Sequence, residues 1–168
     1  MPTGGQSVEL VDTKQIELFV PILKEIDFGD RFLLSMLHWC GIGQRSTPLD
    51  FWQVFLIRSA ERIVGVSGLY RQPGTLKHIC WLGWFALRPM FRRQGFGSAG
   101  IHAIADHARS TGCKELWVYT GSSDEIARRF YTNLGFDILG AARDHAAGQT
   151  MDDSDIVLKL QLAACSHH

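Results

Sequence analysis

Apolar residues recur along this chain with two different periods, and each period predicts a different element. Ile16, Phe19, Val20 and Leu23 are spaced as one face of a helix, and Pro21 inside that pattern should kink the helix or start a second one. Residues 28–39 repeat the helical spacing. Residues 96–110 and 122–134 do so again, and a capping box of Ser122 and Glu125 opens the second of these stretches.

Shorter apolar runs bounded by turn residues predict strands. The expected strands are residues 7–11, 51–59, 63–71, 78–87, 115–119, 136–140 and 155–160, with a polar loop at 141–153. The run at 78–87 is so continuously apolar that both of its faces must be covered. The order of elements predicts an α/β (α+β) fold, in which helices pack on a mixed sheet. A right-handed crossover should make 78–87 and 115–119 parallel.

The length of the chain suits a single domain. We expect one domain over residues 1–168, with a core at 7–162 and a frayed tail at 163–168. Lysine plus arginine equal aspartate plus glutamate at 17 each, so no basic field points to nucleic acid. No apolar run is long enough to span a membrane, and the polar start does not resemble a secretory signal, so we expect a cytoplasmic protein.

The four cysteines are scattered, at positions 40, 80, 113 and 165, without a Cys-x-x-Cys pair. Buried free thiols are therefore expected rather than a redox or zinc site. The histidines also lack ligand spacing, and the sequence predicts no metal.

A glycine turn after the strand at 78–87 carries the first sign of chemistry. Gly95 and Gly97 open the next helix, and Arg88, Arg92 and Arg93 come just before them. Free N–H groups at a helix start bind anions, and arginine suits phosphate. The turn therefore indicates a phosphate-bearing ligand, although an ordinary strand–helix turn with solvated arginines has the same pattern. The sequence lacks a Walker P-loop and the six-residue Rossmann fingerprint.

Two separated segments then match one family. Residues 92–97 (Arg-Arg-Gln-Gly-Phe-Gly) fit Arg/Gln-x-x-Gly-x-Gly/Ala, and residues 127–136 fit Ala-x-x-Phe-Tyr-x-x-x-Gly-Phe. In order and distance they resemble the GCN5-related N-acetyltransferases, the GNAT superfamily. This resemblance implies a mostly antiparallel sheet of six or seven strands with a splayed parallel pair and helices on both faces. It also implies acetyl-CoA as the acyl donor, with no metal.

The resemblance assigns the acetyl-CoA site residue by residue. The glycine turn corresponds to the pyrophosphate site, and the strand before it would pair with the pantetheine arm. Asp124 stands where many members have an asparagine. The implied cofactor-binding residues are Phe85, Ala86, Leu87, Arg92, Arg93, Gln94, Gly95, Phe96, Gly97, Ser98, Asp124, Ala127 and Phe130.

Tyr131 matches the tyrosine that protonates the departing CoA thiolate in many members, although its ring could equally be a core residue. Trp81 and Tyr119 occupy places where some members have a glutamate base. No base is thus implied, and Tyr119, His78 or a water chain could relay the proton.

The acceptor is less defined than the donor. Aromatic residues on the central strands would indicate an apolar or aromatic acceptor if some of them line its cleft. Acidic residues could steer an amine or form a solvated loop; these are Asp144, Asp152, Asp153 and Asp155.

The resemblance implies acetyl transfer to a primary amine of a small molecule or protein, with a homodimer possible. The alternative is a CoA-binding sensor or structural module without catalysis, since the carboxylates are missing. A nucleotide-binding domain unrelated to CoA is a third reading.

Overall fold

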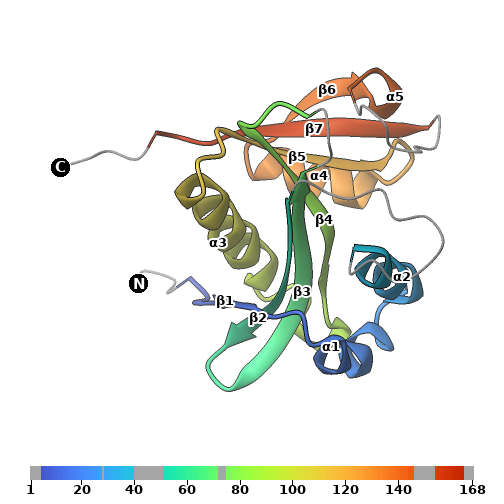
Figure 1. Ribbon diagram of the computed structural model, residues 1–168, viewed down its shortest axis with the longest axis vertical. Helices are drawn as coiled ribbons and strands as arrows, with labels where there is room; N and C mark the ends of the chain where they lie inside the picture. Colours follow the sequence, from blue (N-terminus) through green and yellow to red (C-terminus); the bar gives the residue numbers. More distant parts are fainter. Residues whose placement is uncertain (1–4, 28, 40–50, 72–74, 146–153, 165–168) are drawn as a thin grey trace.

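The computed structural model describes residues 5–27, 29–39, 51–71, 75–145 and 154–164 (Figure 1). Its strands are β1 (Glu9–Asp12), β2 (Phe51–Ser59), β3 (Arg62–Arg71), β4 (Ile79–Leu87), β5 (Glu115–Gly121), β6 (Asp137–Ala141) and β7 (Asp155–Gln161). Its helices are α1 (Ile16–Leu23), α2 (Gly29–Trp39), α3 (Phe96–Ser110), α4 (Glu125–Asn133) and α5 (Ala142–His145), with a 3₁₀ turn at Pro89–Phe91.

The strands form one seven-stranded sheet in the order β1-β2-β3-β4-β5-β7-β6. Only β4 and β5 run parallel, and the other neighbours are antiparallel. The predicted mixed sheet and its parallel pair are therefore confirmed. The parallel pair follows from the crossover through α3, because a strand that returns through a helix enters the sheet in the same direction.

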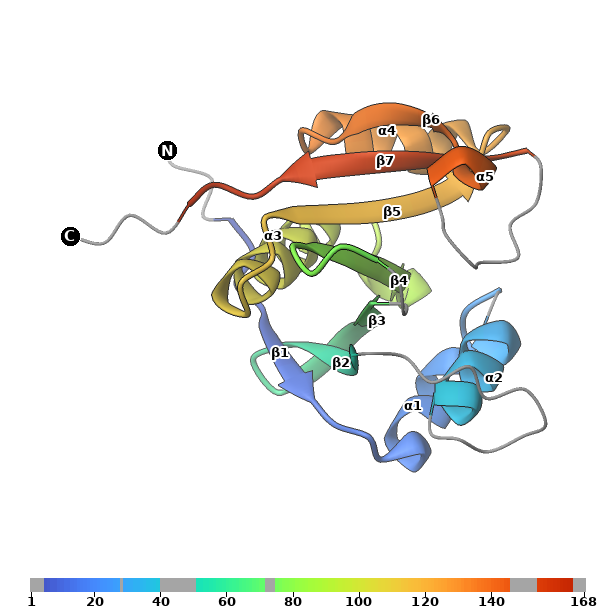
Figure 2. The same ribbon diagram turned by 45° about the horizontal axis from the view of Figure 1, so that its top comes forward.

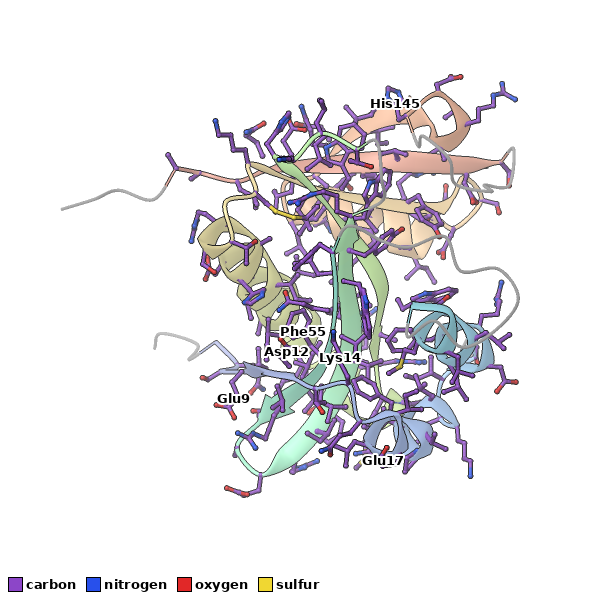
Figure 3. All side chains as sticks on the ribbon, in the orientation of Figure 1. Glu9, Asp12, Lys14, Glu17, Phe55 and His145 are labelled. Atoms are coloured by element: carbon purple, nitrogen blue, oxygen red, sulfur yellow. A yellow bond between two sulfur atoms is a disulfide. The ribbon has the colours of Figure 1, made fainter. Side chains whose placement is uncertain are left out.

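Helices cover both faces of the sheet, as expected. α3 lies on one side of β2, β3 and β4 in Figure 1, and α1 and α2 lie on the other. The α3–α4 face holds a core that joins Phe55 and Leu82 of the sheet to Ile101 of α3 and Tyr131 of α4. Phe55 faces α3, where its ring meets that of His107 (Figure 3).

The α1–α2 face has a core of its own. Phe19, Phe32 and Met36 are fully buried there against strand residues that alternate with those of the other core, among them Val54 and Leu56. Two-residue alternation explains the two cores, because successive side chains of a strand point to opposite faces. Trp39 and His38 are helical, but their side chains lie outside the described part of the chain.

β4 and β5 pair only at their first residues and then separate. The three paired positions are Ile79 with Glu115, Cys80 with Leu116 and Trp81 with Trp117. β4 is further bent by a bulge: Val66 pairs with Ala86 and Gly68 with Gly83, and Trp84 has a positive φ of 56°. Figure 2 shows β5, β7 and β6 grouped apart from β2, β3 and β4. The splayed parallel pair is thus confirmed.

α1 includes Pro21 and ends at Leu23, so no second helix starts at this proline. Two other local expectations were wrong. α4 begins at Glu125 rather than at Ser122, because Asp124 is its N-cap and accepts a hydrogen bond from the Ala127 amide at 3.0 Å. The amide of Ser122 instead donates to the Ser154 carbonyl at 2.8 Å. The expected loop at 141–153 contains the short helix α5, and residues 146–153 lie outside the described residues.

The expectation of free thiols was also wrong for two cysteines. Cys80 of β4 and Cys113 before β5 form a disulfide with their Cα atoms 6.2 Å apart, visible as the yellow bond in Figure 3. The Arg71 guanidinium lies 3.6 Å from both sulfurs. The two cysteines are 33 residues apart in the sequence, and only the crossover through α3 brings them together. The spacing of cysteines in the sequence therefore did not predict this disulfide. Cys40 and Cys165 lie outside the described residues.

No described helix has the length and apolarity needed to cross a membrane. Among the residues that the structure describes, no group of three or more histidine, cysteine or acidic side chains is arranged to hold a metal ion.

Candidate functional site

The glycine turn places an uncapped helix start at the surface. Gly95 is the N-cap of α3 with a φ of 87°, a conformation that glycine adopts without steric cost. No side chain caps the helix, and the first amide bonded along it is that of Ala99, which donates to the Gly95 carbonyl at 3.2 Å. The amides of Phe96, Gly97 and Ser98 therefore come before the helical hydrogen bonds begin, as an anion site requires.

The arginines of the turn divide into two groups. Arg92 and Arg93 are exposed beside Gly95, and Arg92 donates to the Leu87 carbonyl at 3.3 Å. Arg88 instead forms two hydrogen bonds with Glu25, at 2.8 and 3.0 Å, and these hold the pKa of Glu25 below its usual value.

Arg88 belongs to a different part of the surface. With Glu25, Ile63 and Met90 it lines a cavity of about 440 Å³ on the α1 side of the 3₁₀ turn. The expectation that Arg88 adds charge to the phosphate site was therefore wrong, because its guanidinium is held by Glu25.

The side chain of Gln94 turns back on its own loop, where its amide donates to the Met90 carbonyl at 2.8 Å. Phe96 points inward and packs against Phe91, with ring centroids 5.7 Å apart. Of these two candidates for the cofactor site, Gln94 stays exposed, whereas Phe96 can contribute only its backbone.

Gly97 and Gly100 leave room for two stacked rings. A Cβ on Gly97 would lie 3.1 Å from the ring of Phe130, and one on Gly100 would lie 3.0 Å from the ring of Phe85. The rings of Phe85 and Phe130 stack with centroids 6.0 Å apart. The two rings thus join β4 and α4 beneath the start of α3, a role for Gly100 that the motif alone did not reveal.

The strand β4 offers a backbone edge next to the turn. Phe85, Ala86 and Leu87 come after the last β4–β5 pair, so their β5-facing side is not used by β5. Their other side is held by β3, through Ala86 with Val66 and Leu87 with Gly65. Free backbone groups on a fixed strand are the requirement for adding an extended ligand.

Tyr131 lies in the core of the α3–α4 face. Its side chain is 8% exposed, and its ring contacts those of Phe130 and Phe136 at 5.1 and 5.2 Å. Burial raises the pKa of its hydroxyl well above the usual value, and the negative charge of Asp124 adds to the rise. The hydroxyl is therefore protonated at neutral pH, so it has a proton or hydrogen bond to donate and does not act as a base there.

Asp124 and Ala127 form the cap of α4. The Asp124 carboxylate accepts the Ala127 amide, so that amide is already bonded within the chain. Asp124 is exposed and Ala127 is half-buried against the core of the α3–α4 face. The cap thus places one negative charge near Tyr131.

The two proposed proton relays lie in different places. Tyr119 is 36% exposed, and its ring meets that of Trp81 at 6.1 Å. Burial raises its pKa, the charge of Asp155 raises it further, and a hydrogen bond with Tyr70 opposes the rise. His78 precedes β4 at the paired end, where its carbonyl accepts the amides of Lys114 and Glu115. The structure therefore brings Tyr119, but not His78, to the point where β4 and β5 separate.

Tyr131 and Tyr119 lie on opposite faces of the sheet. Val118 packs with Tyr131 in the α3–α4 core, and its neighbour Tyr119 must point to the other face. Opposite faces allow two reactants to approach one gap from different directions. The arrangement suits transfer of a group between a long ligand at the glycine turn and a second molecule on the α1–α2 face.

Comparisons with known proteins agree with this geometry. A family model described as the acetyltransferase (GNAT) family matches residues 18–136. No curated protein sequence matches the chain.

The fold is similar to those of several solved structures at low sequence identity. One is an acetyltransferase from Salmonella typhimurium that modifies the N-terminal serine of a 50S ribosomal subunit protein, with a TM-score of 0.68, 14% identity and coverage of 94% of this chain and 96% of that one. Another is a Bacillus subtilis acetyltransferase in complex with CoA, with a TM-score of 0.65, 16% identity and coverage of 94% and 99%.

A third is the Campylobacter jejuni N-acetyltransferase PseH in complex with acetyl coenzyme A, with a TM-score of 0.61, 18% identity and coverage of 93% and 99%. At such identities the likeness concerns the fold. The family match spans most of the chain, including both motifs, and this chain therefore belongs to the GNAT acetyltransferase family.

Proposed function

We propose that this protein transfers an acetyl group from acetyl-CoA to a primary amine by direct attack of the amine on the thioester. The observation that carries the proposal is the uncapped start of α3 beside the unpaired edge of β4, both next to the gap between β4 and β5. The family match and the relatives solved with CoA or acetyl-CoA support it.

The residues present fit acetyl-CoA as a substrate. The amides of Phe96, Gly97 and Ser98 would hold the pyrophosphate, and Arg92 and Arg93 would add positive charge. The β5-facing edge of Phe85, Ala86 and Leu87 would pair with the pantetheine arm, and the Arg92 guanidinium would leave the Leu87 carbonyl that it now contacts. Gly95 is exposed, with no side chain to block the approach of phosphate oxygens.

The reaction exchanges one bond for another. The nitrogen of a neutral amine forms a bond to the thioester carbon, and the carbon–sulfur bond breaks with its electron pair going to sulfur. Tyr131, kept protonated by burial, donates a proton to the thiolate. The amine loses one proton to water, and Tyr131 regains one from water. Because the attacking nitrogen becomes cationic and therefore acidic as the new bond forms, water can accept its proton, and no carboxylate base is required.

A second candidate function is CoA binding without turnover. It is favoured by the position of Tyr131, which is 8% exposed and packed between two phenylalanine rings, so that its hydroxyl could be structural. Under this alternative, acetyl-CoA binds and is released unchanged.

Steady-state kinetics distinguish the two functions. Purified protein is mixed with acetyl-CoA and a panel of primary amines, and CoA release is followed with a thiol reagent. Amine-dependent, sustained release supports the transferase. Saturable binding of acetyl-CoA with only background hydrolysis across the panel supports the binding module and contradicts the transferase. A homodimer, a cytoplasmic location and a protein or small-molecule acceptor stay predictions.

A further inference from the structure

A row of aromatic side chains crosses neighbouring strands on the α1–α2 face. Trp52 pairs with Tyr70, Tyr70 with Trp81 and Trp81 with Trp117, from β2 to β5. Directly paired residues point to the same face, so these four side chains form one line, here named the aromatic row. The rings of Tyr70 and Trp81 stack at 6.5 Å, and that of Trp117 meets Trp81 edge-on at 5.5 Å.

The aromatic row ends at the gap between β4 and β5. Trp81 and Trp117 are the last paired residues of the two strands. Tyr119 follows two positions later, on the same face, and its hydroxyl is hydrogen-bonded to Tyr70. Trp81 is 2% exposed, whereas Trp117 and Trp52 are half-buried. The Lys14 ammonium lies over the Trp52 ring, 4.1 Å from its centroid, and the ring of His145 meets that of Trp117 at 6.2 Å, so Trp117 keeps an exposed part while the face of Trp52 is already occupied.

A carboxylate stands at the same place. Asp155 opens β7 and pairs with Gly121, two residues after Tyr119 on β5. The period of two puts Asp155 and Tyr119 on one face, and the charge of Asp155 acts on the Tyr119 hydroxyl. Glu115 lies at the other, paired end of β5, where it accepts the indole N–H of Trp117 at 2.9 Å. β4 itself has no carboxylate.

We propose that this surface receives the acceptor and selects a primary ammonium joined to an aromatic or flat apolar group. The ammonium end would lie at Asp155 and the Tyr119 hydroxyl, and the apolar end would lie along the exposed part of the Trp117 ring. A carboxylate beside aromatic faces favours a cation, and stacking on those faces favours a flat substituent. This inference rests on the proposed function, since the amine must reach the thioester in the gap.

The first test compares primary-amine acceptors that differ in their apolar part and in their charge. With saturating acetyl-CoA, kcat/KM is measured for phenethylamine, n-butylamine, spermidine and a serine-starting tripeptide amide. We expect kcat/KM for phenethylamine to exceed that for n-butylamine by about tenfold, which corresponds to about 1.4 kcal/mol and lies within the range for an aromatic pair. Trp117→Leu should reduce this preference while changing the n-butylamine rate much less. Equal rates for the two monoamines, or higher rates for spermidine or the peptide, would overturn the inference.

The second test removes the polar groups. Asp155→Asn should raise KM for phenethylamine about tenfold, and Tyr119→Phe by a smaller factor, with acetyl-CoA affinity changed less than about twofold. Asp106→Asn is the matched control, because Asp106 is exposed on α3, which lies on the other side of the sheet. An unchanged KM in Asp155→Asn contradicts the assignment.

Different results would overturn the proposed acetyl transfer and the proposed choice of acceptor. If wild-type protein does not bind acetyl-CoA in a calorimetric titration, the proposed function fails and the acceptor assignment fails with it. If acetyl-CoA binds and amines are acetylated without a preference for the aromatic one, only the acceptor assignment is overturned.

Discussion

The two faces of the sheet differ in how their functional residues are brought together. On the α3–α4 face, the glycine turn, Phe130 and Tyr131 come from two short continuous segments, each a helix with its start. On the α1–α2 face, the aromatic row and Asp155 come from five strands and depend on their register.

The same difference distinguishes the proposed acetyl-CoA site from the proposed acceptor site. A donor site built from helix starts and a free strand edge uses backbone groups, so it depends on few side chains. An acceptor site built from paired strands uses side chains at fixed register, so each substitution can change selectivity without changing the fold. The substitutions below are expected to affect the two faces differently.

The largest expected effect is on turnover. Tyr131→Phe should lower kcat by about 10²–10⁴-fold, since the departing thiolate loses its proton donor. The affinity for acetyl-CoA should stay within about twofold, because the phenylalanine ring refills the same space. Stopped-flow or steady-state CoA release measures the first quantity and calorimetry the second. Equal losses in both would mean that Tyr131 is only a core residue.

The raised pKa of Tyr131 has a consequence for stability. The neutral hydroxyl is favoured in the folded state, so its contribution is fully present below the unfolded pKa of about 10. That contribution is lost as pH rises through the higher folded value. Urea unfolding at increasing pH should therefore show an alkaline loss of stability that is smaller in Tyr131→Phe. An identical alkaline loss in both proteins argues against a buried hydroxyl.

A substitution in the glycine turn comes next. Gly97→Leu should lower acetyl-CoA affinity by about tenfold or more, because overpacking costs about 1–3 kcal/mol. Its Cβ would lie 3.1 Å from Phe130, so the start of α3 must move.

Gly5→Leu is the control for the glycine turn, since a Cβ there meets nothing within 4 Å. If the clash between the new side chain and the Phe130 ring causes the loss of acetyl-CoA affinity, Phe130→Leu in the Gly97→Leu background should recover part of that affinity. No recovery, with both proteins folded by circular dichroism, would place the leucine in the ligand site instead.

Charge substitutions test which arginines face the donor. Arg93→Met should weaken acetyl-CoA binding about three- to tenfold, with a smaller effect at high salt, because exposed charges are screened. Arg88→Met should leave affinity within about twofold, since Arg88 is paired with Glu25. Calorimetric titrations at two salt concentrations compare the variants. A larger affinity loss in Arg88→Met than in Arg93→Met would contradict the division of the arginines.

The smallest effect is expected at the cap of α4. Asp124→Asn should raise acetyl-CoA affinity about two- to threefold, because a negative charge near phosphates is removed while the cap remains. It should also lessen the rise in the Tyr131 pKa, to which Asp124 contributes. Asp124→Ala is the control that loses the cap. Weaker binding in Asp124→Asn than in the wild type would show that the carboxylate assists the ligand.

Most of the fold could be predicted because its signals are local. The spacing of Phe96 to Ser110 predicted α3 with the bounds it has, and Gly135 correctly ended the segment that carries Tyr131. The parallel pair followed from the crossover alone. Ser122 was wrongly preferred as a cap because it and Asp124 are both good capping residues, and the turn from Gly121 decided between them.

The candidate site was predictable only in part, because many of its contacts join residues that are far apart in the sequence. The motif located the turn, but it did not show that Gly97 faces Phe130 or that Arg88 reaches Glu25, 63 residues away. The Cys80–Cys113 pair and the aromatic row likewise depend on strand register. The hydrophobic periodicity of one segment does not predict contacts between side chains of distant segments.

The most direct test of the account is a calorimetric titration of the purified protein with acetyl-CoA, repeated with CoA as competitor and with Gly97→Leu. We expect saturable binding in the micromolar range, displacement of acetyl-CoA by CoA, and an affinity lower by about tenfold or more in the variant. Absence of binding by the wild type, or displacement by ATP as effective as that by CoA, would contradict the assignment of the glycine turn as an acetyl-CoA site.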